Sequence, residues 1–191
     1  MLRFLLATLL TLTLPLSAAT LTVDVKNARG AAVQDAVVYA VREGKDPGPP
    51  AKRTAVMDQK NRTFVPHVLP IQVGTAVKFP NSDDIRHQVY SFSTAKTFQL
   101  PLYSGTPSTP IVFDKPGVAT LGCNIHDKMS AYIVVVDTPH FAATAKSERV
   151  TLPNLAPGKY VLHVWHPELK ADPVTVTLGG SESRNHLFTV R

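Results

Sequence analysis

Residues 118–136 have the sequence Val-Ala-Thr-Leu-Gly-Cys-Asn-Ile-His-Asp-Lys-Met-Ser-Ala-Tyr-Ile-Val-Val-Val. Both ends of this stretch are short apolar runs rich in β-branched residues, as is typical of strands. The polar loop between them contains Cys123, His126 and Met129, each three residues from the next. The stretch therefore predicts two strands joined by a loop that carries a thiol, an imidazole and a thioether.

On both sides of this stretch, short apolar runs alternate with turns rich in glycine, proline and asparagine. No convincing helical pattern follows the first 20 residues, although residues 138–146 are irregular and would accommodate a short helix. This organisation predicts an all-β sandwich. Further strands are expected at 21–25, 36–41, 76–79, 88–92, 111–113, 149–152, 160–165, 174–178 and 187–190.

The composition limits the kinds of protein that the chain can be. It has 191 residues, 44% of them hydrophobic, with 16 prolines and a formal net charge of +6 at pH 7. That apolar fraction is too high for a disordered chain and too interrupted for many membrane spans. The single cysteine excludes an internal disulfide and a zinc site built on several cysteines. We expect a compact, turn-rich protein whose one thiol has a specific role.

Residues 1–19 are typical of a signal peptide. Residues 1–3 carry a positive charge, residues 4–16 are largely apolar, and Ser17-Ala18-Ala19 supplies the small residues of a cleavage site. The apolar run is too short to span a bilayer comfortably. We therefore expect an exported, periplasmic protein with no integral membrane segment after cleavage. In that compartment a lone thiol needs burial, pairing or a metal.

A second histidine, His87, lies at the start of the strand expected at 88–92 and completes a set of metal ligands. His87, Cys123 and His126 offer two imidazoles and a thiolate, and Met129 offers a weak thioether. This set suits trigonal copper with an axial methionine, whereas zinc prefers four strong ligands. Taken singly, each of these residues would be an ordinary core or strand-end residue. A Cys–His hydrolase would need a separately placed base and an orienting group.

Residues 53–137 resemble the cupredoxin family, which implies a Greek-key β-sandwich. The stretch Phe-Val-Pro from Phe64, followed by Gly-Thr-Ala-Val-Lys-Phe-Pro-Asn from Gly74, is similar to the opening of plastocyanin-like domains. The Cys-His-Met spacing is similar to that of amicyanin, and the segment resembles periplasmic plastocyanin-like proteins labelled "methylamine utilisation". One departure is Gln88, where many cupredoxins have an asparagine that ties the ligand loops together.

The resemblance implies one type 1 copper ion held by His87, Cys123, His126 and Met129, and a protein that carries single electrons between redox partners rather than an enzyme. The positive net charge would attract an acidic partner. Basic residues without interleaved aromatics argue against a nucleic acid as partner. The alternative left open is a periplasmic copper-binding protein or chaperone, or a module that docks a partner or a glycan, without electron transfer.

Residues 20–46 and 147–191 resemble the two halves of a carboxypeptidase-regulatory or transthyretin-like β-sandwich. The resemblance rests on Gly-Ala-Ala-Val-Gln-Asp-Ala from Gly30 and on Leu-Pro-Asn-Leu-Ala-Pro-Gly-Lys-Tyr from Leu152. It implies that residues 53–137 are inserted into a discontinuous module. The alternative is one enlarged cupredoxin sandwich with extra strands from both termini.

Further histidines are candidates for a second site. Strand alternation places His163 and Trp165 on one face and His166 on the other, so we interpret them as strand packing. A second metal site or a sugar-stacking tryptophan is the alternative. His67 and His140 are interpreted as surface residues.

Two acidic residues, Asp83 and Asp84, precede His87 in the sequence. We interpret them as a solvated turn, with a role in the electrostatics of the copper site as the alternative.

Overall fold

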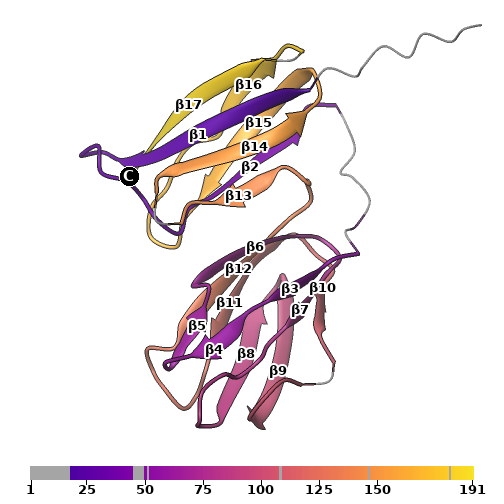
Figure 1. The fold of residues 1–191 in the computed structure, drawn as a ribbon, viewed down its shortest axis with the longest axis vertical. Coiled ribbons are helices and arrows are strands. Elements are labelled where there is room, and N and C mark those ends of the chain that lie inside the picture. The colour runs from indigo at the N-terminus through magenta and orange to yellow at the C-terminus, as the bar shows by residue number, and fades with distance from the viewer. Residues whose placement is uncertain (1–17, 45–49, 51, 108, 146, 181) are drawn as a thin grey trace, which may run out of the picture.

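The computed structural model describes residues 18–44, 50, 52–107, 109–145, 147–180 and 182–191 (Figure 1). These residues form seventeen strands and no helix, so the prediction of an all-β fold is confirmed. In place of the short helix considered at 138–146, the structure has a strand, β13 (Phe141–Ala143). Within the described ranges, no helix is long and apolar enough to cross a membrane. The predicted signal peptide lies almost wholly outside them.

One half of the molecule, the lower one in Figure 1, is a sandwich formed by the middle of the chain. Its larger sheet has the order β6 (Val68–Gln72), β12 (Ser130–Val136), β11 (Gly117–Gly122), β8 (His87–Ser93) and β9 (Lys96–Tyr103). Its smaller sheet has the order β10 (Ile111–Phe113), β7 (Thr75–Lys78) and β3 (Thr54–Val56), beside the hairpin β4 (Asp58–Lys60) and β5 (Thr63–Val65).

A single hydrophobic cluster fills this lower sandwich. It combines Val77 and Phe113 from the smaller sheet with Leu121 and Ile133 from the larger one. Alternation explains the pattern, because successive side chains of a strand point to opposite faces. In β11, Ala119 and Leu121 are buried while their neighbours are exposed or half-buried.

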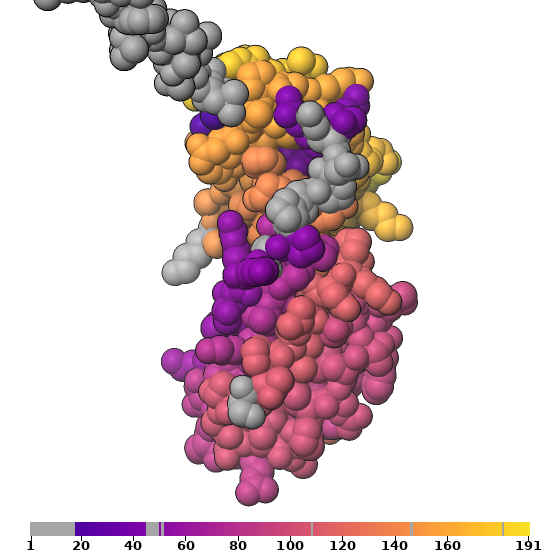
Figure 2. All heavy atoms as spheres, turned by 90° about the vertical axis from the view of Figure 1, so that its right-hand side faces the viewer, coloured from indigo at the N-terminus to yellow at the C-terminus, as the bar shows by residue number. Residues whose placement is uncertain are grey.

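The other half is a second sandwich formed by segments from both ends of the chain. One sheet has the order β14 (Arg149–Leu155), β1 (Ala19–Asn27) and β17 (Ser183–Val190), and the other has the order β13, β2 (Val37–Arg42), β15 (Gly158–Trp165) and β16 (Val174–Leu178). Strand β1 pairs antiparallel with β14 and parallel with β17. Figure 2 shows both ends of the chain together in one half and the middle of the chain in the other.

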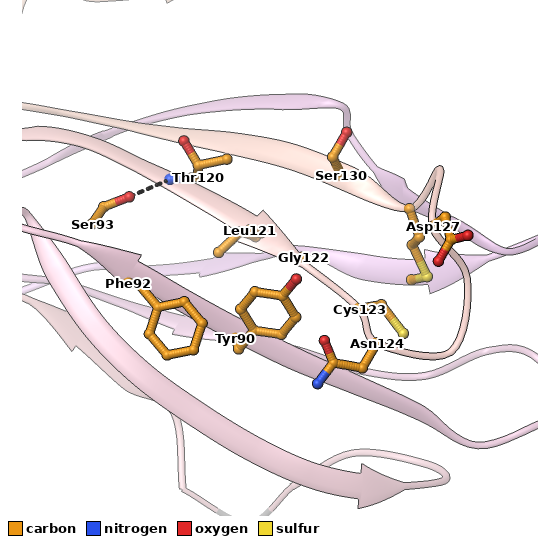
Figure 3. A pocket seen from close by; sticks show the side chains of 11 residues that line it. Tyr90, Phe92, Ser93, Thr120, Leu121, Gly122, Cys123, Asn124, Asp127 and Ser130 are labelled. Atoms are coloured by element: carbon orange, nitrogen blue, oxygen red, sulfur yellow. Dashed lines mark hydrogen bonds between the residues drawn. The ribbon is translucent and has the colours of Figure 1, made fainter.

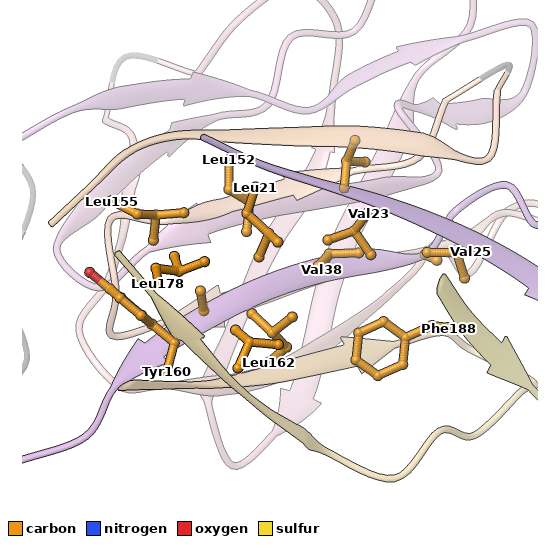
Figure 4. Packing of buried hydrophobic residues seen from close by; sticks show 14 of the residues in the cluster. Leu21, Val23, Val25, Val38, Leu152, Leu155, Tyr160, Leu162, Leu178 and Phe188 are labelled. Atoms are coloured by element: carbon orange, nitrogen blue, oxygen red, sulfur yellow. The ribbon is translucent and has the colours of Figure 1, made fainter. Parts of the chain in front are cut away.

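The core of this upper sandwich comes from strands that are far apart in sequence (Figure 4). Leu21, Val23 and Val25 of β1 point inward at every second position. They meet Leu162 of β15 and Phe188 of β17 in one cluster. The segments from the two ends of the chain therefore share one hydrophobic core.

A third, smaller cluster joins the two sandwiches. It contains Val37 of β2 together with Val68 and Val134 of the lower sandwich. The rings of Tyr132 and Trp165 lie against each other across this contact, with centroids 5.3 Å apart. The two sandwiches are thus packed on each other through apolar side chains.

The boundaries expected at 20–46, 53–137 and 147–191 stay predictions, as does the resemblance of the flanks to a known module. Strand β13, which precedes residue 147, pairs with β2 and so belongs to the sheet of the upper sandwich.

Candidate metal centre

His87 is the first residue of β8 and its side chain is fully buried. The loop before it is held by Asn81, which is 6% exposed. The side-chain amide of Asn81 donates to the carbonyl oxygens of Ile85 and Tyr103, both at 2.9 Å. These two hydrogen bonds join the start of the loop to its end and to β9, so they fix the backbone that leads to His87.

Cys123 follows directly after β11 and is 4% exposed. The hairpin of β11 and β12 ends at the pair Gly122 and Ser130, so residues 123–129 form the loop between them. Inside the loop the amide of Met129 donates to the carbonyl oxygen of His126 at 2.9 Å. This bond closes a compact turn over residues 126–129.

Three of the predicted ligands converge. The donor atoms of His87, Cys123 and His126 all lie within 4.8 Å of one another. The sulfur of Cys123 is 3.9 Å from Nδ1 of His87, and the two imidazole centroids are 5.2 Å apart. In the part of the chain that the structure describes, no other group of three His, Cys, Asp or Glu side chains comes together in this way.

The donor set fits copper. Nδ1 of His126 is buried and has no hydrogen-bond partner. A buried polar atom without a partner destabilises the fold. A metal ion bound to the lone pair of this nitrogen would remove that cost. Thiolate and imidazole together favour copper, and the buried thiol beside them has the softness that Cu(I) prefers.

The structure places the fourth predicted ligand, Met129, next to this group. Met129 is 2% exposed and belongs to the same hydrophobic cluster as Cys123. Both residues also line one open hollow of about 530 Å³. Figure 3 shows Cys123 beside Tyr90 and Asn124 at this hollow. Its role as an axial ligand stays a prediction.

Asp83 contacts His87, so it is placed where sequence reasoning put it only as the alternative to a solvated turn. Its carboxylate lies 2.7 Å from Nε2 of His87, and its side chain is 11% exposed. It also accepts the backbone N–H groups of Asn61 and Arg62, at 2.6 and 2.9 Å. The interpretation of Asp83 as a solvated turn residue was therefore wrong, whereas Asp84 is exposed. The spacing of four residues between Asp83 and His87 was the available signal.

These bonds affect the acidity of Asp83. Burial raises the pKa of its carboxyl, but the bonds from the Arg62 amide, the His87 ring and the Asn61 amide together hold it below the ordinary value. At neutral pH the group is an anion that can only accept hydrogen bonds. Nε2 of His87 is consequently the nitrogen that carries the proton, and Nδ1 is free to bind a metal.

Tyr103 forms another part of the wall around His87, with which it is paired across β8 and β9. Its hydroxyl donates to the carbonyl oxygen of Phe79 at 2.8 Å and accepts from Gln59. Burial raises the pKa of Tyr103 to about 12, although the bond from Gln59 opposes this. The hydroxyl therefore stays protonated and keeps its donor role.

The remaining histidines lie elsewhere. His163 stacks on Tyr39, with ring centroids 4.8 Å apart, and Nδ1 of His166 accepts two backbone amides. Nδ1 of His67 lies within hydrogen-bond distance, 2.8 Å, of the carboxylate of Asp35, a contact between the two sandwiches. The half-buried His140 contacts the ring of Tyr160.

Solved structures similar to this chain include a copper-containing nitrite reductase and cupredoxins. A copper-containing nitrite reductase of Thermus scotoductus SA-01 is 28% identical with a TM-score of 0.41, and the match covers 50% of this chain and 25% of the reductase chain. This chain thus spans about a quarter of the enzyme's length. A purple cupredoxin from Nitrosopumilus maritimus is 23% identical with a TM-score of 0.38, covering 43% of this chain and 99% of that one.

A reduced amicyanin variant is 19% identical with a TM-score of 0.40, covering 51% of this chain and 99% of that one. No protein-family model matches the sequence, and no curated protein matches it.

Proposed function

We propose that this chain is a type 1 copper protein that carries single electrons between protein partners. The observation that supports the proposal is the convergence of His87, Cys123 and His126 within 4.8 Å, at a site where Nδ1 of His126 is buried without a partner. Met129, buried beside Cys123, is proposed as the weak axial ligand.

Copper bound there would supply a one-electron couple. The protein's part is to hold the donors in one arrangement for both oxidation states, since a rigid site keeps reorganisation small. His87 begins a strand, and Cys123 directly follows one. Both side chains are buried, so water is kept away from the ligands.

We propose that the chain is not an enzyme by itself. Four protein ligands would leave no open position for a substrate, unlike catalytic metal sites that keep one. Residues 1–19 support export to the periplasm. The net charge of +6 supports an acidic redox partner, because opposite charge speeds encounter.

The optical and EPR spectra of the copper-loaded protein test the site. We expect an intense blue colour from thiolate-to-Cu(II) charge transfer and its loss in Cys123→Ser. Met57→Leu is the matched control, because Met57 is fully buried in the same hydrophobic cluster and is not a proposed ligand. An ordinary tetragonal copper signal without charge transfer would contradict the proposal.

Repeated oxidation and reduction tests the electron-carrier role separately. A carrier keeps its copper through both states with little structural change. Release of copper on reduction or oxidation, or a colourless protein that binds Cu(I) alone, would favour copper transport or storage instead.

A further inference from the structure

The carboxylate of Asp83 is the meeting point of two loops. It accepts backbone N–H groups from Asn61 and Arg62, in the turn between β4 and β5, and the ring N–H of His87. Both turn residues have left-handed backbone angles, with φ of 55° and 58°. That unusual conformation lets two successive amides point at one carboxylate, as in an anion-binding nest. The position of Asp83 is therefore set by the backbone of a neighbouring hairpin.

Asp83 is also held from its own side of the chain. Its backbone amide donates to Oδ1 of Asn81 at 3.1 Å, and Asn81 in turn is bonded to Ile85 and Tyr103. A carboxylate fixed at both its backbone and its side chain has little freedom to turn away. Its bond to His87 is consequently a fixed part of the site.

The bond to Asp83 decides which nitrogen of His87 faces the thiol. An aspartate is ionised at neutral pH, so it accepts the proton of Nε2. Nδ1 then presents its lone pair 3.9 Å from the sulfur of Cys123. His87 is fully buried and Asp83 nearly so, and charge interactions are stronger in such surroundings than in water.

The two imidazoles of the centre are thus supported differently. His87 has an anionic partner on its outer nitrogen, and that partner makes the inner nitrogen more basic. Among the described residues, no carboxylate is seen to form such a hydrogen bond with the ring of His126. A more basic imidazole stabilises Cu(II) more than Cu(I), and this lowers the reduction potential.

We propose that Asp83 is a positioning residue that fixes the tautomer and orientation of His87 and lowers the reduction potential of the copper centre. The inference rests on the proposed function for its second part. Its first part, the tautomer, concerns the protein without metal. Asp83 also connects the turn between β4 and β5 to the loop before His87.

The first experiment needs no copper. Nitrogen-15 NMR of the imidazoles in the metal-free wild-type protein at neutral pH reports which nitrogen carries the proton. We expect a pure Nε2–H tautomer for His87, and a mixture of tautomers in Asp83→Ala. A dominant Nδ1–H tautomer in the wild-type protein would overturn the proposal, whatever the metal content.

The second experiment compares the copper-loaded Asp83→Asn and Asp84→Asn variants by voltammetry. Both variants remove one negative charge, but Asp84 is exposed and lies beside the site rather than on its histidine. We expect a higher potential in Asp83→Asn and an unchanged potential in Asp84→Asn. Equal shifts, or no shift in either variant, would overturn the proposal. A wild-type protein that lacks the blue spectrum would instead contradict the proposed function while leaving the tautomer result valid.

Discussion

The ring of Tyr90 occupies the space beside Gly122, the residue that precedes Cys123. A Cβ atom on residue 122 would lie 2.5 Å from Cζ of Tyr90 and 2.6 Å from its hydroxyl oxygen. The two residues are also paired in register between β8 and β11, and Figure 3 shows the ring next to the glycine. Because Gly122 has no side chain, the strand that leads to the proposed thiolate ligand can pack directly on the Tyr90 ring.

Gly122→Ala should therefore displace the Tyr90 ring and destabilise the protein by about 1–3 kcal/mol, the usual cost of overpacking. In a Tyr90→Ala background the same substitution should cost much less, because the ring is gone. Chemical denaturation of the four proteins in this double-mutant cycle measures the coupling. An identical cost in both backgrounds would show that the ring does not restrict residue 122.

Asn81→Ala should loosen the loop that delivers His87. It removes the two hydrogen bonds donated to the carbonyls of Ile85 and Tyr103 and the one accepted from the Asp83 amide, at a cost of about 2 kcal/mol. Hydrogen exchange should accelerate at the amides of residues 81–87. Asn81→Asp is the control, since it retains the oxygen that accepts the Asp83 amide but loses the donor. Unchanged exchange in Asn81→Ala would contradict this role.

Trp165→Ala should weaken the contact between the two sandwiches. Trp165 lies against Tyr132 and packs on the cluster that joins them, and its partial burial suggests a loss of about 2–3 kcal/mol. Phe92→Ala is the control, because Phe92 is 75% exposed and should change stability by less than about 0.5 kcal/mol. Calorimetry of Trp165→Ala should resolve two unfolding transitions, and equal effects of the two substitutions would refute the contact's importance.

The ion pair of Asp24 and Arg149 should make stability depend on pH in acid. The guanidinium donates to both carboxylate oxygens, at 2.7 and 2.9 Å, and this hydrogen bonding lowers the pKa of Asp24. Because the folded-state pKa is depressed, the stabilisation is present above about pH 4 and is lost as the pH falls through the folded-state value.

The unfolding free energies of wild type and Asp24→Asn should hence differ at neutral pH and converge at about pH 2. The control is Asp172→Asn, whose pair with Arg191 is more exposed, at 85% for the Asp172 side chain against 23% for Asp24. Its effect should be smaller. A constant difference between wild type and Asp24→Asn across this range would contradict the assignment.

The strand pattern and the convergence of three predicted ligands were both accessible from the sequence. Strand alternation at Leu21, Val23 and Val25 directly reports which side chains face the core. For the site, the loop of Cys123 and His126 is local, so its spacing alone brings two donors together. His87 could be added because a strand start is visible as a change in hydropathy.

The hydrogen bonds of Asp83 could not be chosen from the sequence, since its spacing of four residues from His87 does not tell where the carboxylate points. That direction depends on Asn61 and Arg62, more than 20 residues away, whose amides it accepts. Strand β13 was missed because three half-buried residues have no periodic pattern, and its pairing with β2 is decided by tertiary structure.

The way in which both ends of the chain complete one sandwich has a consequence for the order of folding. Contacts in the lower sandwich join residues 54–136, whereas Asp24 must meet Arg149, which lies 125 positions further along the chain. Closure of long loops is slow relative to local pairing. During synthesis, β1 and β2 emerge first, but their edges are covered only after strands from β13 onward have been made. The metal ligands would accordingly assemble before the ends of the chain join.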